Sequence, residues 1–491
     1  MAGCIVLVAT AAFAGESRDT QAGRTRLGND VVAATWKVQG GVLSNLVVTD
    51  GRNEATIEVT DPFSVTLKGS NAIGTGDFRL QGGLHEVALP ADARASRLAE
   101  RIPGKAVEGV FVDPTGNLRI DWKLVQREGS NYLREIVTLT ALNEDAPITK
   151  VSLFGANAPD AIVDGSVDGS PVTSHDDWLG FEHPMSKADA WRGKVKLWIE
   201  RTLPLPKGQS VTYSAVIGVA HAGQMRRDFA QYIERERAHP YRTFLHYNSW
   251  YDIGFFTPYT EAEALDRINT FGKKLVETRH VKMDSFLFDD GWDDYSGSWN
   301  FSKAFPNGFV PLCKAAKKYG AAPGIWLSPW GGYGKPHDER VANGRKLGYG
   351  IVDGSLALSA PKYWKRFHEV VMTLLNDDCI NQFKFDGTGN VNSVYPGSEF
   401  DSDFAAAIQL IDDIRADKPA TFINLTTGTW ASPFWLRYAD SIWRDGYDHN
   451  FTGVGPYREQ WITYRDEQTY RNIVEKGPLF PINSLMLHGI I

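Results

Sequence analysis

Residues 361–386 read PKYWKRFHEVVMTLLNDDCINQFKFD. The first part of this stretch predicts a helix over 361–376. Its last six residues predict a short, mostly apolar strand over 381–386 that ends in an aspartate. Strands and helices alternate in the same way through the rest of the second half of the chain. Such alternation predicts consecutive parallel strands in one sheet, with helices covering it.

The number of these units favours a (β/α)8 barrel over residues 241–491. A further helix is expected over 261–277. The expected strands are 243–250, 285–290, 321–328, 381–386, 421–426, 440–445 and 479–489. Seven strands are found where a closed barrel has eight, and an open barrel would expose strand edges. We therefore expect the barrel to be incomplete at its C-terminal side, as in a piece of a longer chain.

The first half of the chain has a different sequence pattern. From about residue 25 to 225 the pattern is short, alternating and rich in turn residues, with expected strands such as 118–124 and 136–142. Many short strands separated by Gly, Asn and Asp predict a β-sandwich. A charged helix within a linker over 226–240 joins it to the barrel. The fold class is therefore multidomain, a β-sandwich followed by an α/β barrel.

Composition excludes several classes of protein. The chain has 491 residues, with 43% hydrophobic and 23% charged, which is ordinary for a soluble globular protein. The net charge of −7 argues against general nucleic-acid binding, which needs a basic face. The three cysteines lack the spacing of a zinc site, and Cys313 and Cys379 need not pair. The 15 tryptophans fit either a large core or sugar stacking.

The N-terminus predicts export. Residues 5–13 are nearly all apolar, and Ala12-Phe13-Ala14 has the small-x-small form of a cleavage site. We expect a signal peptide over residues 1–14 and a secreted or periplasmic protein; a disordered or buried N-terminal segment is the alternative. The apolar run is much shorter than the roughly 20 residues that span a bilayer. No other stretch of the sequence predicts a membrane span.

Polar and aromatic residues gather where the expected strands end, which is the catalytic end of a barrel. The five clusters are Asn248-Ser249-Trp250, Asp289-Asp290-Gly291-Trp292, Trp326 to Trp330, Lys384-Phe385-Asp386-Gly387 and Arg444-Asp445-Gly446-Tyr447-Asp448. One acidic residue after a strand is most often a helix cap. Five clusters at the same end indicate an active site.

Retaining glycoside hydrolysis needs two carboxylates, one as nucleophile and one as acid/base. Asp386 fits the nucleophile, and strand periodicity places Lys384 on the same face, where its charge would keep Asp386 ionised. A structural ion pair is the alternative. Asp448 is the acid/base candidate, because Arg444 four residues earlier could turn with it toward the same pocket. Asp445, nearer the strand end, competes with it.

Asp289 and Asp290 are candidates for a sugar anchor, because adjacent carboxylates can accept hydrogen bonds from neighbouring hydroxyls. The same pair could also form a turn or bind a metal, but no further acidic pattern completes a metal site. Trp250, Trp326 and two other tryptophans, Trp292 and Trp330, could form the walls of the pocket or simply belong to the core.

These motifs resemble glycoside hydrolase family 36 and, more distantly, family 27, the retaining α-galactosidases and α-N-acetylgalactosaminidases. The matching segments are Phe383-Lys384-Phe385-Asp386-Gly387, Phe288-Asp289-Asp290-Gly291-Trp292, Asn248-Ser249-Trp250 and Gly324-Ile325-Trp326. Arg444-x-x-x-Asp448 matches the family 27 pattern whose aspartate is the acid/base, which favours Asp448 over Asp445. The resemblance covers about 240–491 by motif.

The resemblance implies an exo-acting hydrolase in which Asp386 attacks, Asp448 donates the proton, and Trp250, Asp289, Asp290, Trp326, Lys384 and Arg444 hold the sugar. It implies no cofactor and an oligosaccharide or glycoconjugate as substrate. The loop over 424–430 departs from family 36, which has a Cys and a Gly-Gly there, so galactose and N-acetylgalactosamine both stay open. A transglycosylase and a non-catalytic sugar-binding protein are the alternatives. The oligomeric state stays open too.

Overall fold

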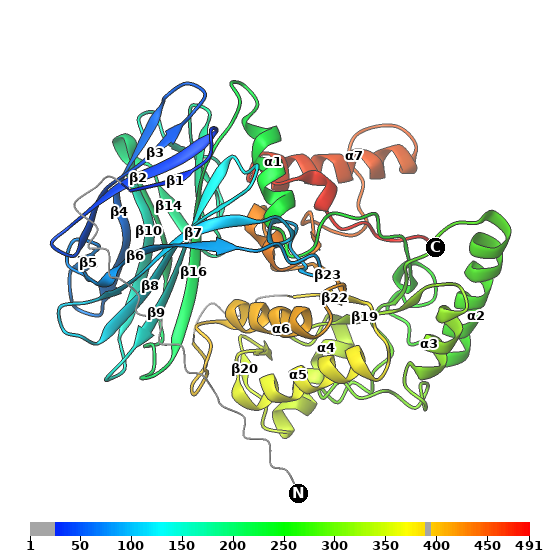
Figure 1. Cartoon of the computed structure of the whole chain (residues 1–491). Coiled ribbons are helices and arrows are strands. Elements are labelled where there is room, and N and C mark those ends of the chain that lie inside the picture. The colour runs from blue at the N-terminus through cyan, green and yellow to red at the C-terminus, as the bar shows by residue number, and fades with distance from the viewer. Residues whose placement is uncertain (1–24, 388–393) are drawn as a thin grey trace, which may run out of the picture.

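The computed structural model describes residues 25–387 and 394–491 (Figure 1). The expected signal peptide over 1–14 lies outside the described residues. Two antiparallel sheets form one side of the molecule, and a parallel sheet with its helices forms the other. Within the described residues, no helix combines the length and the apolar character needed to cross a membrane.

The first antiparallel sheet has the order β1-β2-β3-β4-β10-β15-β14, with β5 paired to β4. Its strands are β1 (Thr25–Gly28), β2 (Val32–Gln39), β3 (Val42–Asp50), β4 (Thr56–Leu67), β5 (Ala72–Gly74), β10 (Ile148–Asn157), β14 (Lys187–Asp189) and β15 (Lys194–Glu200). The second sheet has the order β11-β12-β13-β16-β9-β8-β7-β6. Its strands are β6 (Arg79–Leu89), β7 (Gly104–Val112), β8 (Leu118–Arg127), β9 (Tyr132–Ala141), β11 (Ile162–Val163), β12 (Val172–Ser174), β13 (Asp177–Phe181) and β16 (Ser210–Val219).

The two sheets pack face to face around an aromatic core. Trp36 of β2 meets Trp122 of β8 edge-on, with ring centroids 6.4 Å apart, and Phe63 of β4 meets Phe111 of β7 at 5.3 Å. Buried and less buried residues alternate along β9, as expected for a strand with one face in a core. The β-sandwich expected from the sequence is therefore present.

The parallel sheet has the order β17-β18-β19-β22-β23-β24. Its strands are β17 (His246–Asn248), β18 (Ser285–Phe288), β19 (Ala322–Leu327), β22 (Gln382–Phe385), β23 (Phe422–Leu425) and β24 (Ser441–Ile442), and a separate hairpin holds β20 (Ile351–Val352) and β21 (Ser355–Leu356). The six strands correspond to six of the seven expected, and all neighbours are parallel.

The seventh expected strand, over 479–489, does not form a regular strand. Residues Ile482–Ser484 form a 3-10 turn instead. The extended residues that follow make single parallel bridges, from Leu485 to Ile442 on β24 and from Ile490 to Tyr247 on β17. This segment lies between the last and first strands. The described residues thus form a partial barrel, in line with the incomplete barrel expected from the sequence, and the (β/α)8 architecture itself is not confirmed.

Helices cover the outside of the parallel sheet and join it to the sandwich (Figure 1). The α-helices are α1 (Met225–Glu236), α2 (Glu261–Phe271), α3 (Val310–Lys317), α4 (Gly334–Lys346), α5 (Pro361–Asn376), α6 (Asp403–Asp417) and α7 (Tyr457–Thr469). The shorter turns are η1 (Ala99–Arg101), η2 (Trp191–Gly193), η3 (Ser249–Tyr251), η4 (Gly272–Glu277), η5 (Pro433–Arg437), η6 (Tyr470–Val474) and η7 (Ile482–Ser484), of which η4 and η6 are π-helical.

Local sequence explains two of these helices. The Thr260 hydroxyl caps α2 by accepting from the backbone N–H of Glu263, and the Glu263 carboxylate accepts from the backbone N–H of Thr260, so both hydrogen bonds of a capping box are present. Helix α5 begins at Pro361, a residue favoured at the first helical position. Its buried residues include Phe367 and Val371, one turn apart, which face the sheet. The helix expected over 361–376 is confirmed.

Buried ion pairs connect the sandwich to the helical half. Arg134 on β9 pairs with Glu182 at 2.6 Å and with Glu236 of α1 at 3.0 Å. Arg437 of η5 also pairs with Glu182, at 3.1 Å. Each carboxylate is nearly inaccessible to solvent and is matched by a guanidinium, the condition under which buried charges are tolerated. The network fixes how the two halves meet.

A disulfide bond joins Cys313 on α3 to Cys379, which lies between α5 and β22. The sequence left the pairing of these cysteines open, because they are 66 residues apart and belong to no recognisable spacing pattern. Tertiary structure places their Cα atoms 6.0 Å apart, within the range of disulfides. The bond therefore links two segments just outside the sheet, close to the strand that carries Asp386.

Candidate active site

The polar residues predicted as a site lie at the carboxyl ends of the parallel strands. Asp289, Asp386 and Thr426 each follow directly after the last residue of their strands, β18, β22 and β23. Trp250 lies in η3 just after β17, and Asp448 lies in the segment after β24. In parallel α/β sheets this end is where ligands bind, because strand ends and loops converge there.

Asp386 is held by three side-chain donors. Trp326 donates its indole N–H to Oδ2 at 3.1 Å, and the hydroxyls of Tyr333 and Thr426 donate to Oδ1 at 2.9 and 2.6 Å. Only 9% of the residue is exposed. Three donors on two oxygens leave the carboxylate one orientation, which is the preorganisation that a nucleophile requires. Sequence predicted Asp386 and Trp326 but missed Tyr333 and Thr426.

A glycine shapes the turn after this carboxylate. Gly387 has φ +83°, in the left-handed region that favours glycine. A Cβ at this position would lie 2.7 Å from the indole of Trp330. The missing side chain lets Trp330 approach the backbone directly beside Asp386. Trp330 thus borders the site, as one of the two sequence interpretations held.

Lys384 forms its ion pair with Asp289 rather than with Asp386. Its Nζ lies 2.8 Å from Oδ2 of Asp289, and both side chains are buried. Burial alone would lower the pKa of Lys384, but the charges of Asp289 and Asp386 outweigh it and raise the pKa. Lys384 is therefore cationic. Its positive charge interacts electrostatically with Asp386, and its hydrogen bond holds the side chain of Asp289 in place.

Asp290 forms part of a buried network that sequence reasoning missed. Arg340 of α4 binds both oxygens of Asp290 and donates to Asp293 at 2.6 and 3.0 Å. The guanidinium also lies over the rings of Trp299 and Trp326, 4.6 and 5.3 Å from their centroids. No motif marks Arg340, because the contact depends on how α4 returns to the sheet. Asp290 is thus oriented by Arg340 beside the site.

Asp448 lies near Tyr333 and Lys384, on whose pKa values its charge acts. The indole of Trp250 donates to its Oδ2 at 3.1 Å, which connects the end of β17 to the segment after β24. Asp445, the competing candidate, is exposed and accepts a hydrogen bond from the backbone N–H of Gly446. Its φ of +68° turns the chain at that point. The geometry therefore favours Asp448 as the second carboxylate.

Arg444 is buried beneath this segment. Its guanidinium donates to the carbonyl oxygens of Asp445 at 2.7 Å and Tyr447 at 3.1 Å, and it lies over the ring of Trp443. These contacts fold the chain between β24 and Asp448. The sequence expected Arg444 to hold the sugar; in the structure its hydrogen bonds support the backbone that carries Asp448.

Two groups interact with both carboxylates. The charges of Asp386 and Asp448 both act on Lys384, and both raise the pKa of the Tyr333 phenol beyond the effect of its burial. Tyr333 therefore stays protonated and remains a donor. Trp292, in contrast, is fully buried and donates its indole N–H to the carbonyl of Trp326, so it belongs to the core. At this end of the sheet, two carboxylates thus act on a shared cation and a shared phenol.

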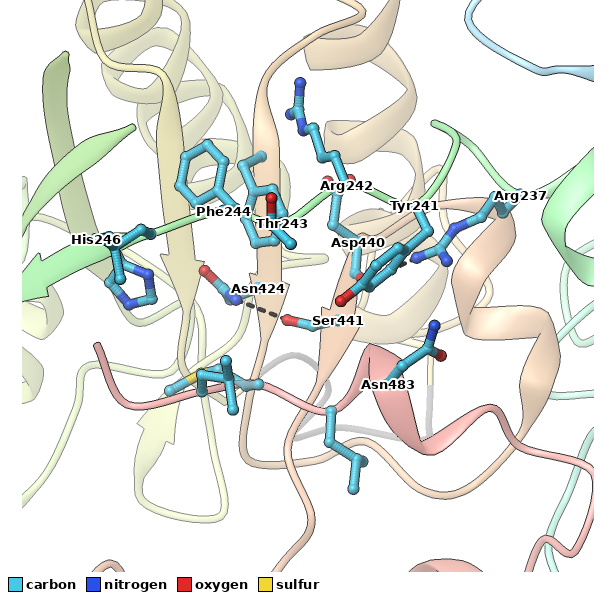
Figure 2. A pocket seen from close by; sticks show the side chains of 15 residues that line it. Arg237, Tyr241, Arg242, Thr243, Phe244, His246, Asn424, Asp440, Ser441 and Asn483 are labelled. Carbon is cyan, nitrogen blue, oxygen red and sulfur yellow. Dashed lines mark hydrogen bonds between the residues drawn. The ribbon is translucent and has the colours of Figure 1, made fainter. Parts of the chain in front are cut away.

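A separate cavity of about 180 Å³ lies at the amino ends of the same strands (Figure 2). Its lining residues are Arg237, Tyr241, Arg242, Thr243, Phe244, Leu245, His246, Phe422, Asn424, Asp440, Ser441, Asn483, Leu485, Met486 and Leu487. Asn424 donates to Ser441 at 2.6 Å, and Gln382 donates to Asn424 at 2.9 Å. Barrel interiors are usually filled by branched apolar residues. This cavity is at the opposite end of the sheet from Asp386.

Among the described residues, no group of three or more His, Cys, Asp or Glu side chains could hold a metal ion. No known protein-family model matches the sequence, and no curated protein matches it. The fold, however, matches solved structures. The chain is similar to the family 36 α-galactosidase AgaA of Geobacillus stearothermophilus, with 13% identity and a TM-score of 0.56 over 86% of this chain and 75% of that one.

Two further structures give the same result. The α-galactosidase of Lactobacillus brevis is 12% identical, with a TM-score of 0.55 over 86% of this chain and 72% of that one. A variant of AgaA in complex with raffinose is 13% identical, with a TM-score of 0.54 over 86% of this chain and 75% of that one. Likeness at this identity establishes the fold. The resemblance to family 36 drawn from the motifs is confirmed at that level.

Proposed function

We propose that the protein is a retaining, exo-acting α-glycoside hydrolase that removes a terminal α-linked galactose or N-acetylgalactosamine from an oligosaccharide or glycoconjugate. One observation carries the proposal: Asp386 and Asp448 both follow strands of the parallel sheet at its carboxyl end, and the charges of both act on Lys384 and Tyr333. Two carboxylates on either side of a scissile bond are the requirement for this chemistry. The fold shared with family 36 α-galactosidases supports the same proposal.

In the first step, Asp386 attacks the anomeric carbon while Asp448 donates its proton to the glycosidic oxygen. The bond to the leaving group breaks, and a covalent β-glycosyl ester forms on Asp386. In the second step Asp448 takes a proton from water, whose oxygen attacks the anomeric carbon and releases Asp386. Each of the two steps inverts the configuration at the anomeric carbon, so the two steps together retain the α configuration.

The surrounding side chains have distinct roles in this mechanism. Trp326, Tyr333 and Thr426 keep Asp386 in its attacking orientation. Asp289 and Asp290 accept hydrogen bonds from sugar hydroxyls, and Lys384 both orients Asp289 and neutralises part of the negative charge. Trp250 orients Asp448. Each step uses side chains of this chain and water, and the proposal includes no cofactor.

The first test is hydrolysis of aryl α-galactoside and aryl α-N-acetylgalactosaminide by the purified protein. Asp386→Asn should reduce turnover to background. Asp448→Asn should lower kcat/KM by about 10²- to 10⁴-fold, the usual value of a general acid, and less for a leaving group that needs no proton. Asp445→Asn is the matched control and should keep wild-type activity. Folded protein that hydrolyses neither substrate would refute the proposal.

Reaction with azide distinguishes the nucleophile from the acid/base residue. In Asp386→Gly, azide can replace the missing nucleophile and attack from the β face, so the product is the β-glycosyl azide. In Asp448→Gly, azide attacks the glycosyl ester on Asp386, so the product is the α-glycosyl azide. NMR identifies the products. If Asp386→Gly gave the α-glycosyl azide and Asp448→Gly the β-glycosyl azide, the roles of the two aspartates would be exchanged. A wild-type enzyme that makes oligosaccharides rather than free sugar would instead be the transglycosylase.

We also propose that the protein is exported. The apolar run over residues 5–13 with its small-x-small site and the bonded pair Cys313–Cys379 both support this, since disulfides persist in oxidising compartments. The N-terminal sequence of the protein recovered from a secreting host tests it. Cleavage after Ala14 is expected, and an intact N-terminus in the cytoplasmic fraction alone would refute export.

A further inference from the structure

Three aromatic rings, those of Trp250, Phe255 and Phe256, form a surface beside Asp448, and the proposed mechanism gives the two phenylalanines no role. Phe255 and Phe256 follow η3, and their ring centroids lie 5.0 and 4.9 Å from that of Trp250 and 5.1 Å from each other. Phe255 is 52% exposed and Phe256 is 61% exposed. Single exposed apolar residues are common, but a contiguous exposed group indicates a binding surface. We call these three residues the aromatic ledge.

The ledge is held in place by its own loop. Asp252 accepts hydrogen bonds from Tyr247 at 2.8 Å and from Arg267 at 2.6 Å, and the N–H of Gly254 donates to the carbonyl of Ser249 at 2.8 Å. These contacts tie the start of the loop to β17 and α2. The two phenylalanines are therefore presented to solvent by a fixed backbone.

The backbone of Phe256 adds an independent observation. Its φ is +47°, in the left-handed region, which costs a residue with a side chain roughly 1–2 kcal/mol. A bulky aromatic residue in that conformation is uncommon, and glycine would adopt it without strain. Burial cannot explain the choice, because the side chain is mostly exposed. Strained residues of this kind concentrate at ligand-binding sites.

The position of the ledge defines what it would contact. Trp250 links it directly to Asp448 through the 3.1 Å hydrogen bond. The general acid gives its proton to the glycosidic oxygen, so the leaving group lies on the side of the acid. A ledge attached to Asp448 therefore borders the leaving group, while Asp289 and Lys384 belong to the sugar that is cleaved off.

We infer that the aromatic ledge binds the leaving group of the substrate, and that this group is a pyranose ring. The inference rests on the proposed hydrolase function. A pyranose offers an apolar C–H face that stacks on aromatic rings, and the three rings of the ledge form a compact group with centroids 4.9–5.1 Å apart. A lipid chain would need a longer groove. The natural substrate would then be an α-linked oligosaccharide rather than a glycolipid.

The test compares two substrates that share the cleaved sugar and differ in the leaving group: an α-galactosyl-(1→6)-glucose disaccharide and methyl α-galactoside. Phe256→Ala should lower kcat/KM for the disaccharide by about 3- to 10-fold, mainly through KM, the size expected for one aromatic contact. The value for methyl α-galactoside and inhibition by free galactose should change by less than about twofold. Trp191→Ala removes an aromatic ring that is 68% exposed on the sandwich half and should change neither.

A second variant separates binding from folding. Phe256→Gly keeps the backbone conformation and relieves its strain, so the melting temperature should stay equal or rise while the disaccharide effect persists. A lower melting temperature would make Phe256 a structural residue and overturn the inference. Equal losses on both substrates, or no loss on either, would also overturn it.

These experiments distinguish failure of the ledge proposal from failure of the proposed hydrolase function. If the wild type hydrolyses galactosides and the ledge variants equal the wild type, only the ledge proposal fails. If the wild type hydrolyses nothing, titration of the Asp386→Asn protein with the disaccharide, followed by tryptophan fluorescence, decides. Saturable binding weakened by Phe256→Ala supports the ledge, and absence of binding refutes it together with the hydrolase.

Discussion

Removal of the Arg340 guanidinium gives the sharpest test of how the site is built. Arg340 has no exposed side-chain surface, and it binds Asp290 and Asp293, whose side chains are 13% and 0% exposed. In Arg340→Met the two carboxylates would stay buried without a counter-charge. Breaking a buried pair by removing one partner costs about 3–5 kcal/mol. The loss of ring contacts with Trp299 and Trp326 adds to this cost.

The expected result is a large loss of thermal stability. For a unit of 150–250 residues, each kcal/mol shifts the melting temperature by about 2–4 °C, so the shift should be about 6–20 °C. Differential scanning calorimetry measures it, and Arg345→Met, an exposed arginine on the same helix, is the matched control. Adding Asp293→Asn to Arg340→Met should recover part of the loss, because one buried charge is removed.

A melting temperature of Arg340→Met within about 2 °C of the wild type would refute the reasoning, since it would show that the buried carboxylates need no cation. A loss that Asp293→Asn does not reduce would assign the effect to packing instead of charge. The activity of the double variant is informative as well. Asp290 without Arg340 loses its fixed orientation, so KM for the galactoside should rise while kcat changes less.

Three further predictions follow from single contacts. Tyr333→Phe removes a donor to Asp386, so kcat should fall by about 10- to 150-fold, the value of a hydrogen bond to a charged group, and an unchanged kcat would contradict the role given to the phenol. Cys313→Ser opens a loop of 66 residues, so the free energy of unfolding in urea should fall by about 4 kcal/mol, and dithiothreitol should have the same effect on the wild type only. Burial lowers the pKa of His246 to about 4, below the ordinary 6.5, so the unfolded chain binds more protons between these values. Stability should therefore fall as the pH drops from 6.5 toward 4, by about 3 kcal/mol from this group, and the pH dependence of urea unfolding should be weaker in His246→Gln; equal pH profiles would contradict it.

The sequence predicted the parts of the site that lie on strands. Lys384 lies on β22 and Asp386 directly follows the strand two residues later, and the period of a strand places them on one face whatever surrounds them. Asp289 directly follows β18, and parallel strands put both ends on the same side of the sheet. The same local logic predicted helix 361–376 and six of the seven strands. These features depend on neighbours in the chain.

Residues brought by loops and helices could not be predicted in the same way. Tyr333 and Arg340 follow β19 by several residues, and their contacts with Asp386 and Asp290 exist only because the chain after β19 turns back over the sheet. The choice of Asp448 over Asp445 was drawn from a family motif; in the structure it depends on a left-handed turn and a bond from Trp250, 198 residues away in the chain.

The sandwich, the parallel sheet and the carboxylates at its strand ends could be predicted from the sequence, because hydrophobic period and strand direction are local properties. Tertiary structure decided which charges pair, which cysteines bond and how the last segment meets β17 and β24. The physical reason is that a salt bridge, a disulfide or a strand contact needs atoms within a few ångströms. Between residues far apart in the chain, only the packing of the whole molecule sets that distance.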